Sequence, residues 1–370
     1  MKTVMLTNSL VLSGCLAISP AYPENYGQQT NEVTQERANT RPGIQRPSTS
    51  CDGSLLARMA RELTPGSYVE LPTRGFTDEL DFDGHANTVF GYTYEAFWDP
   101  GTCRVLFIGG GHLSLTKFLT YSASDNLWTQ APDPSFLCPI KKNDGSVAWG
   151  CVNHAYGLQA MDAERGVFYY MFADGNVYGI KTDASLSNPW KRVGTVPEGV
   201  NYTYASIEYF READRIVVID PDKLSLLDPS SGKWSFIEGP FDRGSYRYHG
   251  VYNPLYGIML FEGRDDLEMD KLDAQGKVTR VADSPREFNP QPDDASFKIL
   301  TYDPTSGNYL AYAMNGELFV YDVTFDRWSQ VDMRLPPGVY LAAVIPSYAV
   351  IMLIDPWEDK HIWLYKHSGR

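Results

Sequence analysis

The sequence of 370 residues has little positive charge, few histidines and few cysteines. It holds 32 Lys and Arg against 46 Asp and Glu, for a formal net charge of -14, with 6 His and 5 Cys. A chain with this excess of negative charge repels polyanions, which argues against nucleic acid or an anionic membrane surface as its main partner. An acidic sugar could still bind where Arg and His residues gather.

Long apolar runs are also missing. No stretch reaches the roughly 20 apolar residues needed to cross a bilayer, so we expect no transmembrane anchor. Residues 1–19 instead have the features of an export signal, with Lys2 before a short apolar run that ends in Leu-Ser-Gly-Cys at Cys15. This ending resembles a bacterial lipobox, in which Cys15 is lipidated; an ordinary cleaved signal is the alternative. We therefore expect an exported protein, either an outer-membrane lipoprotein or a secreted one.

Residues 20–50 contain almost no large apolar side chains and are rich in Pro, Asn, Gln and Thr, a composition typical of a disordered linker. The folded domain is expected over residues 51–370. Four cysteines follow the signal, and an even number in an exported chain predicts two disulfides with three alternative connectivities. We favour Cys138 with Cys151, which closes a short loop, and Cys51 with Cys103. Buried free thiols are the alternative.

Several short motifs lack residues that a cofactor or metal site requires. The three glycines Gly109–Gly111 are not followed by the Gly-Lys-Ser/Thr of a phosphate-binding loop. The acidic stretch from Asp81 to Gly84 lacks the remaining ligands and the closing Glu of a calcium-binding EF-hand. The spacing of Cys and His does not suggest a zinc site. We therefore expect no cofactor and leave open only a structural metal ion.

A four-part pattern recurs along the chain. Each copy has an aromatic or apolar strand that ends near Asp-Pro, an apolar strand that ends near Gly, a strand with Tyr or Leu before Asp, and a closing Trp. In residues 295–331 these parts are Ile299–Pro304, Tyr309–Tyr312, Leu318–Asp322 and Trp328. Related units begin near Gly91, His154, Tyr202, Ser245 and Tyr340.

Repeated four-stranded units predict an all-β fold, a β-propeller with blades arranged radially around a channel. We count six repeats. The last one lacks a fourth strand, and residues 68–71 have the right character to supply it, which would join the two ends of the ring and cover an exposed sheet edge. A β-sandwich and a solenoid are the alternative folds.

Aligning the repeats brings several polar residues to one end of the predicted channel. His154 and Tyr248 lie at the opening of a first strand, whereas His112 and Arg264 each follow the end of a second strand. Because first and second strands are antiparallel, the start of one and the end of the next lie on the same face. We therefore expect these four residues to gather at one mouth of the channel.

The same residues resemble those of β-propeller polysaccharide lyases of the ulvan lyase type, which have kelch-like repeats. The shared features are Gly-Gly-Gly-His at the end of a second strand, His-x-Tyr opening the next unit at His154, and a Tyr and an Arg separated by one hairpin. The resemblance covers most of residues 68–366 and implies seven blades. It also implies β-elimination at a uronic acid of an acidic polysaccharide, such as an algal polymer of rhamnose and uronate.

The resemblance implies a role for each residue of the catalytic set. Arg264 neutralises the uronate carboxylate, Tyr248 takes the proton at C5, and His154 protonates the departing oxygen. A nearby positive charge favours the phenolate form of Tyr, so Tyr248 can act as a base. On a regular strand His249 points away from the side of Tyr248, and a bulge would exchange them, which makes His249 the substitute candidate. Further substrate-binding candidates are His112, Tyr202, Arg247, His249 and Asn153.

Plainer interpretations stay open for these residues. Most of the 24 tyrosines of a propeller pack in strands, and Arg264 precedes two aspartates with which it could form a surface ion pair. One alternative function is a kelch-like propeller on the cell surface that binds glycans or a protein without chemistry. Another is a copper oxidase, for which the expected disulfides leave no free thiol. With a lyase we expect a monomer whose partner is an acidic polysaccharide.

Overall fold

The computed structural model describes most of the chain from Cys51 onward. The described residues are 51–81, 89–90, 93–110, 116–132, 134, 136, 155–172, 174–183, 185–198, 200, 205–220, 223–238, 249–262, 267–288, 296–357 and 360–369. The chain divides into two units, residues 1–40 and 41–370, and all described elements belong to the second. Within the described ranges, no helix combines the length and apolarity needed to span a membrane.

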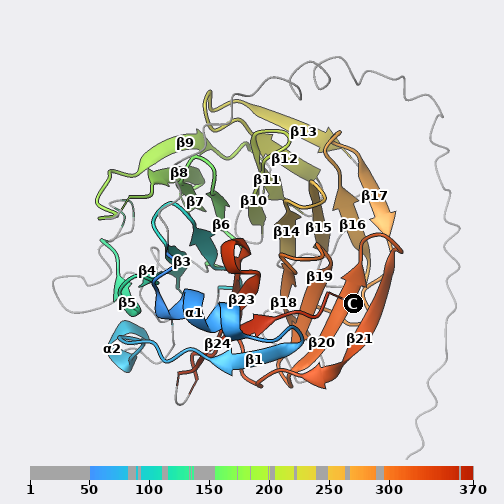
Figure 1. Ribbon diagram of the computed structural model, residues 1–370. Coiled ribbons are helices and arrows are strands. Elements are labelled where there is room, and N and C mark those ends of the chain that lie inside the picture. The colour runs from blue at the N-terminus through green and yellow to red at the C-terminus, as the bar shows by residue number, and fades with distance from the viewer. Residues whose placement is uncertain are drawn as a thin grey trace, which may run out of the picture. The chain divides into compact units, whose positions relative to one another are not determined.

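The described strands form six four-stranded antiparallel sheets that stand as blades around a common axis (Figure 1). This confirms the predicted all-β propeller of six repeats. Each of the first five blades takes four consecutive strands of the chain. Blade 1 has β2(Phe97–Asp99), β3(Arg104–Gly109), β4(Lys117–Ser122) and β5(Leu127–Gln130); blade 2 has β6(Gln159–Asp162), β7(Val167–Met171), β8(Asn176–Lys181) and β9(Lys191–Thr195). Blade 3 has β10(Ser206–Phe210), β11(Arg215–Ile219), β12(Lys223–Leu227) and β13(Trp234–Glu238). Blade 4 has β14(His249–Asn253), β15(Ile258–Glu262), β16(Met269–Leu272) and β17(Val278–Val281); blade 5 has β18(Phe297–Tyr302), β19(Tyr309–Ala313), β20(Glu317–Asp322) and β21(Arg327–Arg334).

Blade 6 joins the two ends of the ring. Its strands are β22(Leu341–Ile345), β23(Val350–Ile354), β24(Ile362–Lys366) and β1(Ser67–Glu70), in that order from the channel outward. Tyr68 pairs with Tyr365 and Val69 with Leu364 in an antiparallel ladder, and Figure 1 shows β1 beside β24. The closing strand expected at residues 68–71 is thus confirmed, and it covers the edge of β24.

The seven blades implied by the family resemblance are wrong for this chain. The long segment of residues 131–152 lies between β5 and β6, where a further blade would have to stand. Thr93, just before β2, forms a parallel bridge to Tyr156, just before β6, while Glu95 bridges to Ala342 on β22. The inner segment of blade 1 therefore contacts blades 2 and 6 directly, which leaves no place for another blade between them.

The Asp-Pro signature of the repeats marks the turn after an inner strand. Asp99 accepts a hydrogen bond from the Gly101 amide at 2.9 Å, and Asp303 accepts one from the Ser306 amide at 2.8 Å. Both aspartates are fully buried. A short acidic side chain that caps its own turn removes the cost of leaving those amides unpaired, which explains why the pattern recurs.

The N-terminal part of the described chain packs on blades 1 and 6. Helix α1(Leu55–Glu62) starts at Ser54, whose hydroxyl accepts a hydrogen bond from the Ala57 amide at 3.1 Å. A disulfide joins Cys51 to Cys103, in the turn between β2 and β3, as predicted. Cys15, Cys138 and Cys151 lie outside the described residues. The remaining short elements are α2(Asp78–Asp81) and the 3₁₀ turn η2(Pro346–Tyr348).

Candidate functional site

Most residues of the predicted site fall in parts of the chain that the structure does not describe. They are the catalytic candidates Tyr248, His154 and Arg264 and the substrate-binding candidates His112, Tyr202, Arg247 and Asn153. The structure describes His249. It also describes the ends of the strands that precede or follow each of the others.

His249 begins β14 and lies inside the channel. Its ring stacks on that of Tyr94, with centroids 4.4 Å apart and an angle of 24° between the planes. Tyr94 precedes β2 of blade 1, and blades 1 and 4 stand opposite one another in the ring of six, so the two rings meet across the channel. Burial first, and then the positive charge of Lys298, lower the pKa of His249 to about 3. The imidazole is therefore neutral at neutral pH.

Lys298 brings a positive charge to the same place. It is the second residue of β18 and is fully buried. Its ammonium nitrogen lies 4.5 Å from the centroid of the Tyr94 ring and 3.7 Å from that of Tyr340. A desolvated ammonium on an aromatic face gains about 2 kcal/mol. The Tyr156 ring lies 5.3 Å from that of Tyr94. We call these residues the channel cluster: Tyr94, Tyr156, His249, Lys298 and Tyr340.

The channel cluster contains groups that can accept or donate a proton, and it also contains a cation. A neutral imidazole accepts a proton, a phenol donates one, and an ammonium stabilises a carboxylate. Lys298 and Tyr94 were not among the residues predicted from the sequence. A signal for Lys298 was present, because it stands between Phe297 and Ile299 in a strand whose neighbours are buried. A charged residue at such a position indicates a specific partner inside the fold.

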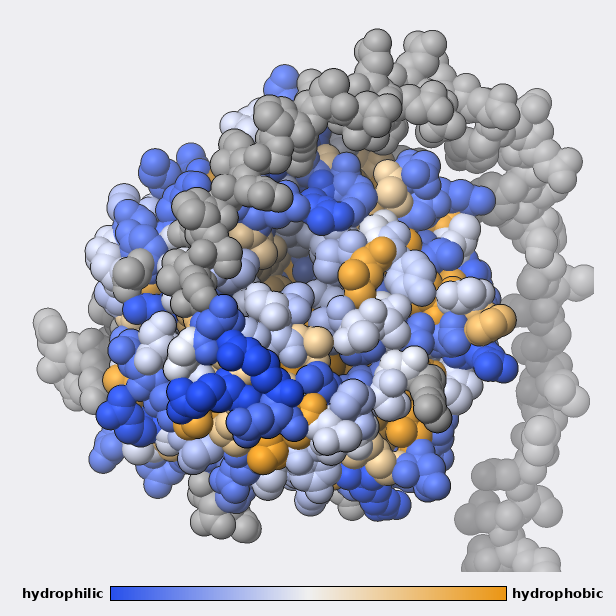
Figure 2. Space-filling view, viewed as in Figure 1, coloured by the Kyte–Doolittle hydropathy of each residue, from blue (hydrophilic) through white to orange (hydrophobic). Residues whose placement is uncertain are grey.

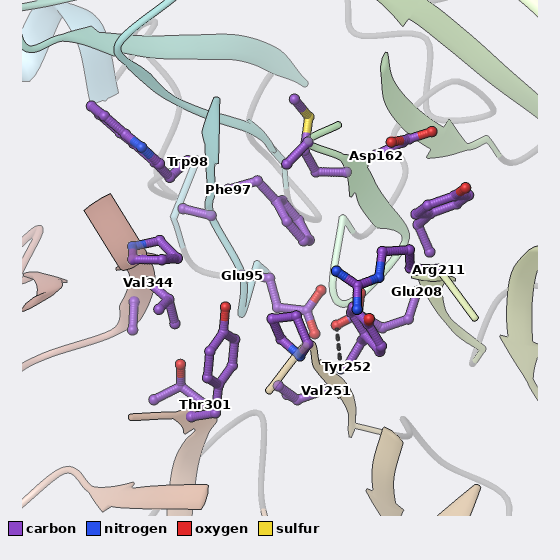
Figure 3. Close-up of a pocket in the computed structure, with 18 of the residues that line it drawn as sticks. Glu95, Phe97, Trp98, Asp162, Glu208, Arg211, Val251, Tyr252, Thr301 and Val344 are labelled. Carbon is purple, nitrogen blue, oxygen red and sulfur yellow. Dashed lines mark hydrogen bonds between the residues drawn. The ribbon is translucent and has the colours of Figure 1, made fainter. Parts of the chain in front are cut away.

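The opposite end of the channel opens into a cavity of about 260 Å³ (Figure 3). The inner strands run parallel to one another, and their final residues and the turns that follow them form its wall. The face that carries α1 is hollowed near its middle in Figure 2. Most of the wall is aromatic or apolar: Phe97, Trp98, Met161, Tyr252, Leu300, Tyr302 and Val344.

Two glutamates lie deep in this cavity. Glu95 is 8% exposed and Glu208 is 7% exposed, and their carboxylates point toward one another in Figure 3. Burial, and then the charge of Glu208, hold the pKa of Glu95 well above its usual range. Burial raises the pKa of Glu208 to about 8. The two carboxylates therefore hold at least one proton between them at neutral pH.

Gln159 fixes the backbone that carries Glu95. Its amide nitrogen donates to the Glu95 carbonyl at 3.1 Å and to the Thr93 hydroxyl at 2.9 Å, and its amide oxygen accepts from the Ile108 backbone at 2.7 Å. Gln159 is fully buried on β6 and so ties blade 2 to blade 1 beside the cavity. Among the described residues, no group of three or more His, Cys, Asp or Glu side chains is placed to hold a metal ion.

Comparison with known proteins supports the fold. No family model matches the sequence, and no curated protein matches it. The chain is similar in structure to a protein of unknown function from Bacteroides thetaiotaomicron, with a TM-score of 0.55 and 12% identity over 81% of this chain and 76% of that one. It is also similar to a streptogramin B lyase, with a TM-score of 0.48 and 9% identity over 80% of this chain and 97% of the other. A virginiamycin B lyase from Staphylococcus aureus has a TM-score of 0.44 and 12% identity over 78% and 81% of the two chains. At 12% identity, the similarity to the Bacteroides protein shows the fold alone.

Proposed function

We propose that this propeller is a polysaccharide lyase that cleaves a uronic-acid-containing polysaccharide by β-elimination, at the end of the channel where the inner strands begin. The observation that carries the proposal is the meeting of His249, Lys298 and Tyr94 from three blades. They supply a proton acceptor, a cation and a phenol, the kinds of group that this elimination uses.

The residues implicated by the ulvan lyase resemblance adjoin this end of the channel along the chain. Tyr248 directly precedes His249, and His154 directly precedes Ala155, the described residue next to Tyr156. Arg264 follows the end of β15, and His112 follows the end of β3. Since the end of a second strand lies beside the start of the first, these four positions support a shared site with the channel cluster.

The proposed reaction needs no co-reactant. A base takes the proton from C5 of the uronate, the freed electron pair forms the C4–C5 double bond, and the bond from C4 to the glycosidic oxygen breaks as that oxygen takes up a proton. A cation on the carboxylate stabilises the negative charge that develops after proton removal. We assign Arg264, assisted by Lys298, to the carboxylate, Tyr248 to the base with His249 as its substitute, and His154 to the acid.

An exported location fits this substrate, because the polysaccharide is outside the cell. The disulfide between Cys51 and Cys103 supports it, since such bonds persist in oxidising compartments. We propose that the protein is secreted or is held at the outer membrane by a lipid on Cys15.

Ultraviolet absorbance tests the proposal, because elimination creates an unsaturated uronate that absorbs. The purified protein is incubated separately with ulvan, glucuronan, alginate, pectate and a rhamnose-capped arabinogalactan. We expect absorbance to rise on one of them, and to rise at less than a hundredth of that rate with Tyr248→Phe, His154→Ala or Arg264→Ala. Tyr256→Phe, which removes an exposed tyrosine on the blade 4 hairpin, is the matched control and should keep the parent rate.

Glycan binding without chemistry is the second candidate function. It is favoured by the burial of the channel cluster, where His249 is 2% exposed and Lys298 is 0% exposed. On this alternative, the folded protein would be retained on one of the polysaccharides without shortening it and without any rise in absorbance.

A further inference from the structure

The proposed elimination leaves the cavity at the other end of the channel without a role. This cavity is built from all six blades and lies where the inner strands end. Tyr94 touches both places, since it lines the cavity and stacks on His249. The cavity is therefore a second compartment of the same channel.

The side chain of Glu95 indicates that this cavity binds a ligand. Both of its carboxylate oxygens are buried, and neither has a hydrogen-bond partner among the residues that the structure describes. The side chain is 8% exposed and is directed into the cavity in Figure 3. A buried carboxylate without donors is costly to a fold. A ligand that brings N–H donors and positive charge would remove this cost.

Glu208 adds a second acceptor opposite the first. One of its oxygens accepts a hydrogen bond from the Tyr252 backbone amide at 3.2 Å. Two carboxylates that face one another in a buried site repel when both are ionised. A cation between them would favour the ionised form of both, with release of the proton that they hold, because each carboxylate would then attract the cation.

The cations near the cavity are engaged elsewhere. Arg211 stands on the rim, and its guanidinium pairs with Glu212 at 2.9 Å and with Glu164 at 3.4 Å. The rim carboxylate of Asp162 pairs with Arg165 at 3.2 Å. These ion pairs of the rim do not include Glu95 or Glu208, and acidic side chains outnumber basic ones in the wall.

The wall also indicates the kind of cation. Calcium takes six to eight oxygen ligands, and magnesium holds its waters in a polar site. Here the carboxylates are surrounded by rings and apolar side chains, among them Phe97, Trp98 and Tyr302. Aromatic faces attract a positive charge and bury carbon, which is the environment that organic cations prefer. A cavity of about 260 Å³ is large enough for a small organic molecule.

We propose that this cavity binds an organic ammonium ion, whose N–H groups donate to Glu95 and Glu208 and whose carbon body packs against Phe97 and Trp98. The site would take a primary amine on a ring or a short apolar chain. It is separate from the lyase site, so binding here and elimination there can be measured independently.

Isothermal titration calorimetry of the full-length protein tests this with three probes that share a benzyl group. Benzylammonium carries charge and donors, benzyltrimethylammonium carries charge without N–H, and benzyl alcohol is neutral. We expect benzylammonium to bind at least tenfold tighter than benzyl alcohol, with benzyltrimethylammonium between them. Glu95→Gln and Glu208→Gln should each weaken benzylammonium at least tenfold and change benzyl alcohol less than twofold. Glu268→Gln is the matched control. Glu268 directly precedes β16, and its side chain is 60% exposed, so the affinity for all three probes should be unchanged.

Several results would overturn the proposal. These are equal affinity for amine and alcohol, unchanged benzylammonium affinity in both glutamine variants, displacement of benzylammonium by millimolar calcium, or no binding of any probe to the parent protein. A thermal melt of each variant confirms that it is folded. Because each substitution replaces a carboxyl group by an amide of nearly the same shape, we expect both variants to fold.

Discussion

The rings of His249 and Tyr94 stack 4.4 Å apart across the channel, and this contact joins opposite blades of the propeller. On one side of it lie the ammonium of Lys298 and the strand ends next to the predicted lyase residues. On the other side lies the cavity that holds Glu95 and Glu208. One compartment holds a cation and the other holds two carboxyl groups, so they can be tested by separate substitutions.

Replacement of Lys298 tests the cation of the lyase compartment. Lys298→Met keeps an unbranched side chain of nearly the same length and removes the charge that would support the uronate carboxylate. We expect kcat/KM for the cleaved polysaccharide to fall about 100-fold, the scale found when one group that stabilises a developing negative charge is lost. Lys271→Met, on β16 of blade 4, is the control. A Lys298→Met protein with the parent kcat/KM would remove Lys298 from the reaction.

Acid should destabilise the protein through His249. Its pKa is about 3 in the folded protein and about 6.5 when unfolded, so below pH 6.5 the unfolded chain binds a proton that the folded one does not. The free energy of unfolding should therefore fall as pH falls, by about 2 kcal/mol from this residue between pH 7 and pH 5. Urea unfolding at the two pH values, for the parent and for His249→Phe, measures this. A His249→Phe protein with the same loss as the parent would contradict the burial of a neutral imidazole.

The buried glutamates should act in the opposite sense. Their pKa values are raised on folding, so the folded state holds protons that the unfolded state releases as pH rises from about 4.5 to about 8. The stability from this pair is present at low pH and is lost as pH rises. Other charged or titratable groups that line the cavity are Tyr94, Asp162, Glu164, Tyr209, Arg211, Tyr252 and Tyr302.

Glu95→Gln separates this effect from that of the other groups. Removing one member of the pair removes both its desolvation cost and the repulsion with Glu208. We expect the variant to be more stable than the parent at pH 8 and to show a flatter dependence of unfolding free energy on pH above 5. Glu268→Gln should follow the parent. A variant that is less stable than the parent at pH 8 would show that the Glu95 carboxylate is satisfied in the folded protein.

The blades could be predicted from the sequence because the patterns that define them lie within short segments. Strand alternation and the turn after each inner strand lie within one repeat, so Ile299–Pro304 and Trp328 could be assigned to β18 and β21 without knowledge of the rest of the chain. Counting these repeats predicted six blades correctly, where the family resemblance implied seven. The closing strand followed from the one repeat that lacked a partner.

The two compartments could not be predicted from the sequence, because they are formed by contacts between blades. Glu95 and Glu208 come from blades 1 and 3, and His249 and Tyr94 come from opposite blades. The alternation of residues within one strand does not reveal which residues of another blade a side chain will contact. The site predictions therefore came from the lyase resemblance, and of those residues the structure describes His249.

The disulfide between Cys51 and Cys103 should contribute substantially to stability. It closes a loop with a sequence separation of 52 residues, which corresponds to about 4 kcal/mol in the chain-entropy description. We expect the Cys51→Ser, Cys103→Ser double variant to lose about that much unfolding free energy in urea. Because the bond ties the start of α1 to blade 1, added reductant should lower the melting temperature of the parent more than that of the variant. Equal melting temperatures for both proteins in oxidising buffer would contradict this contribution.

The mass of the reaction products tests the proposed elimination most directly. After digestion of the polysaccharide that the protein cleaves, elimination leaves fragments whose new non-reducing end is lighter by one water than the corresponding hydrolysis fragment. We predict that mass spectrometry finds only these unsaturated fragments, and that Tyr248→Phe, His154→Ala and Arg264→Ala produce almost none. Saturated fragments, or an uncleaved polymer bound to a folded protein, would contradict the account.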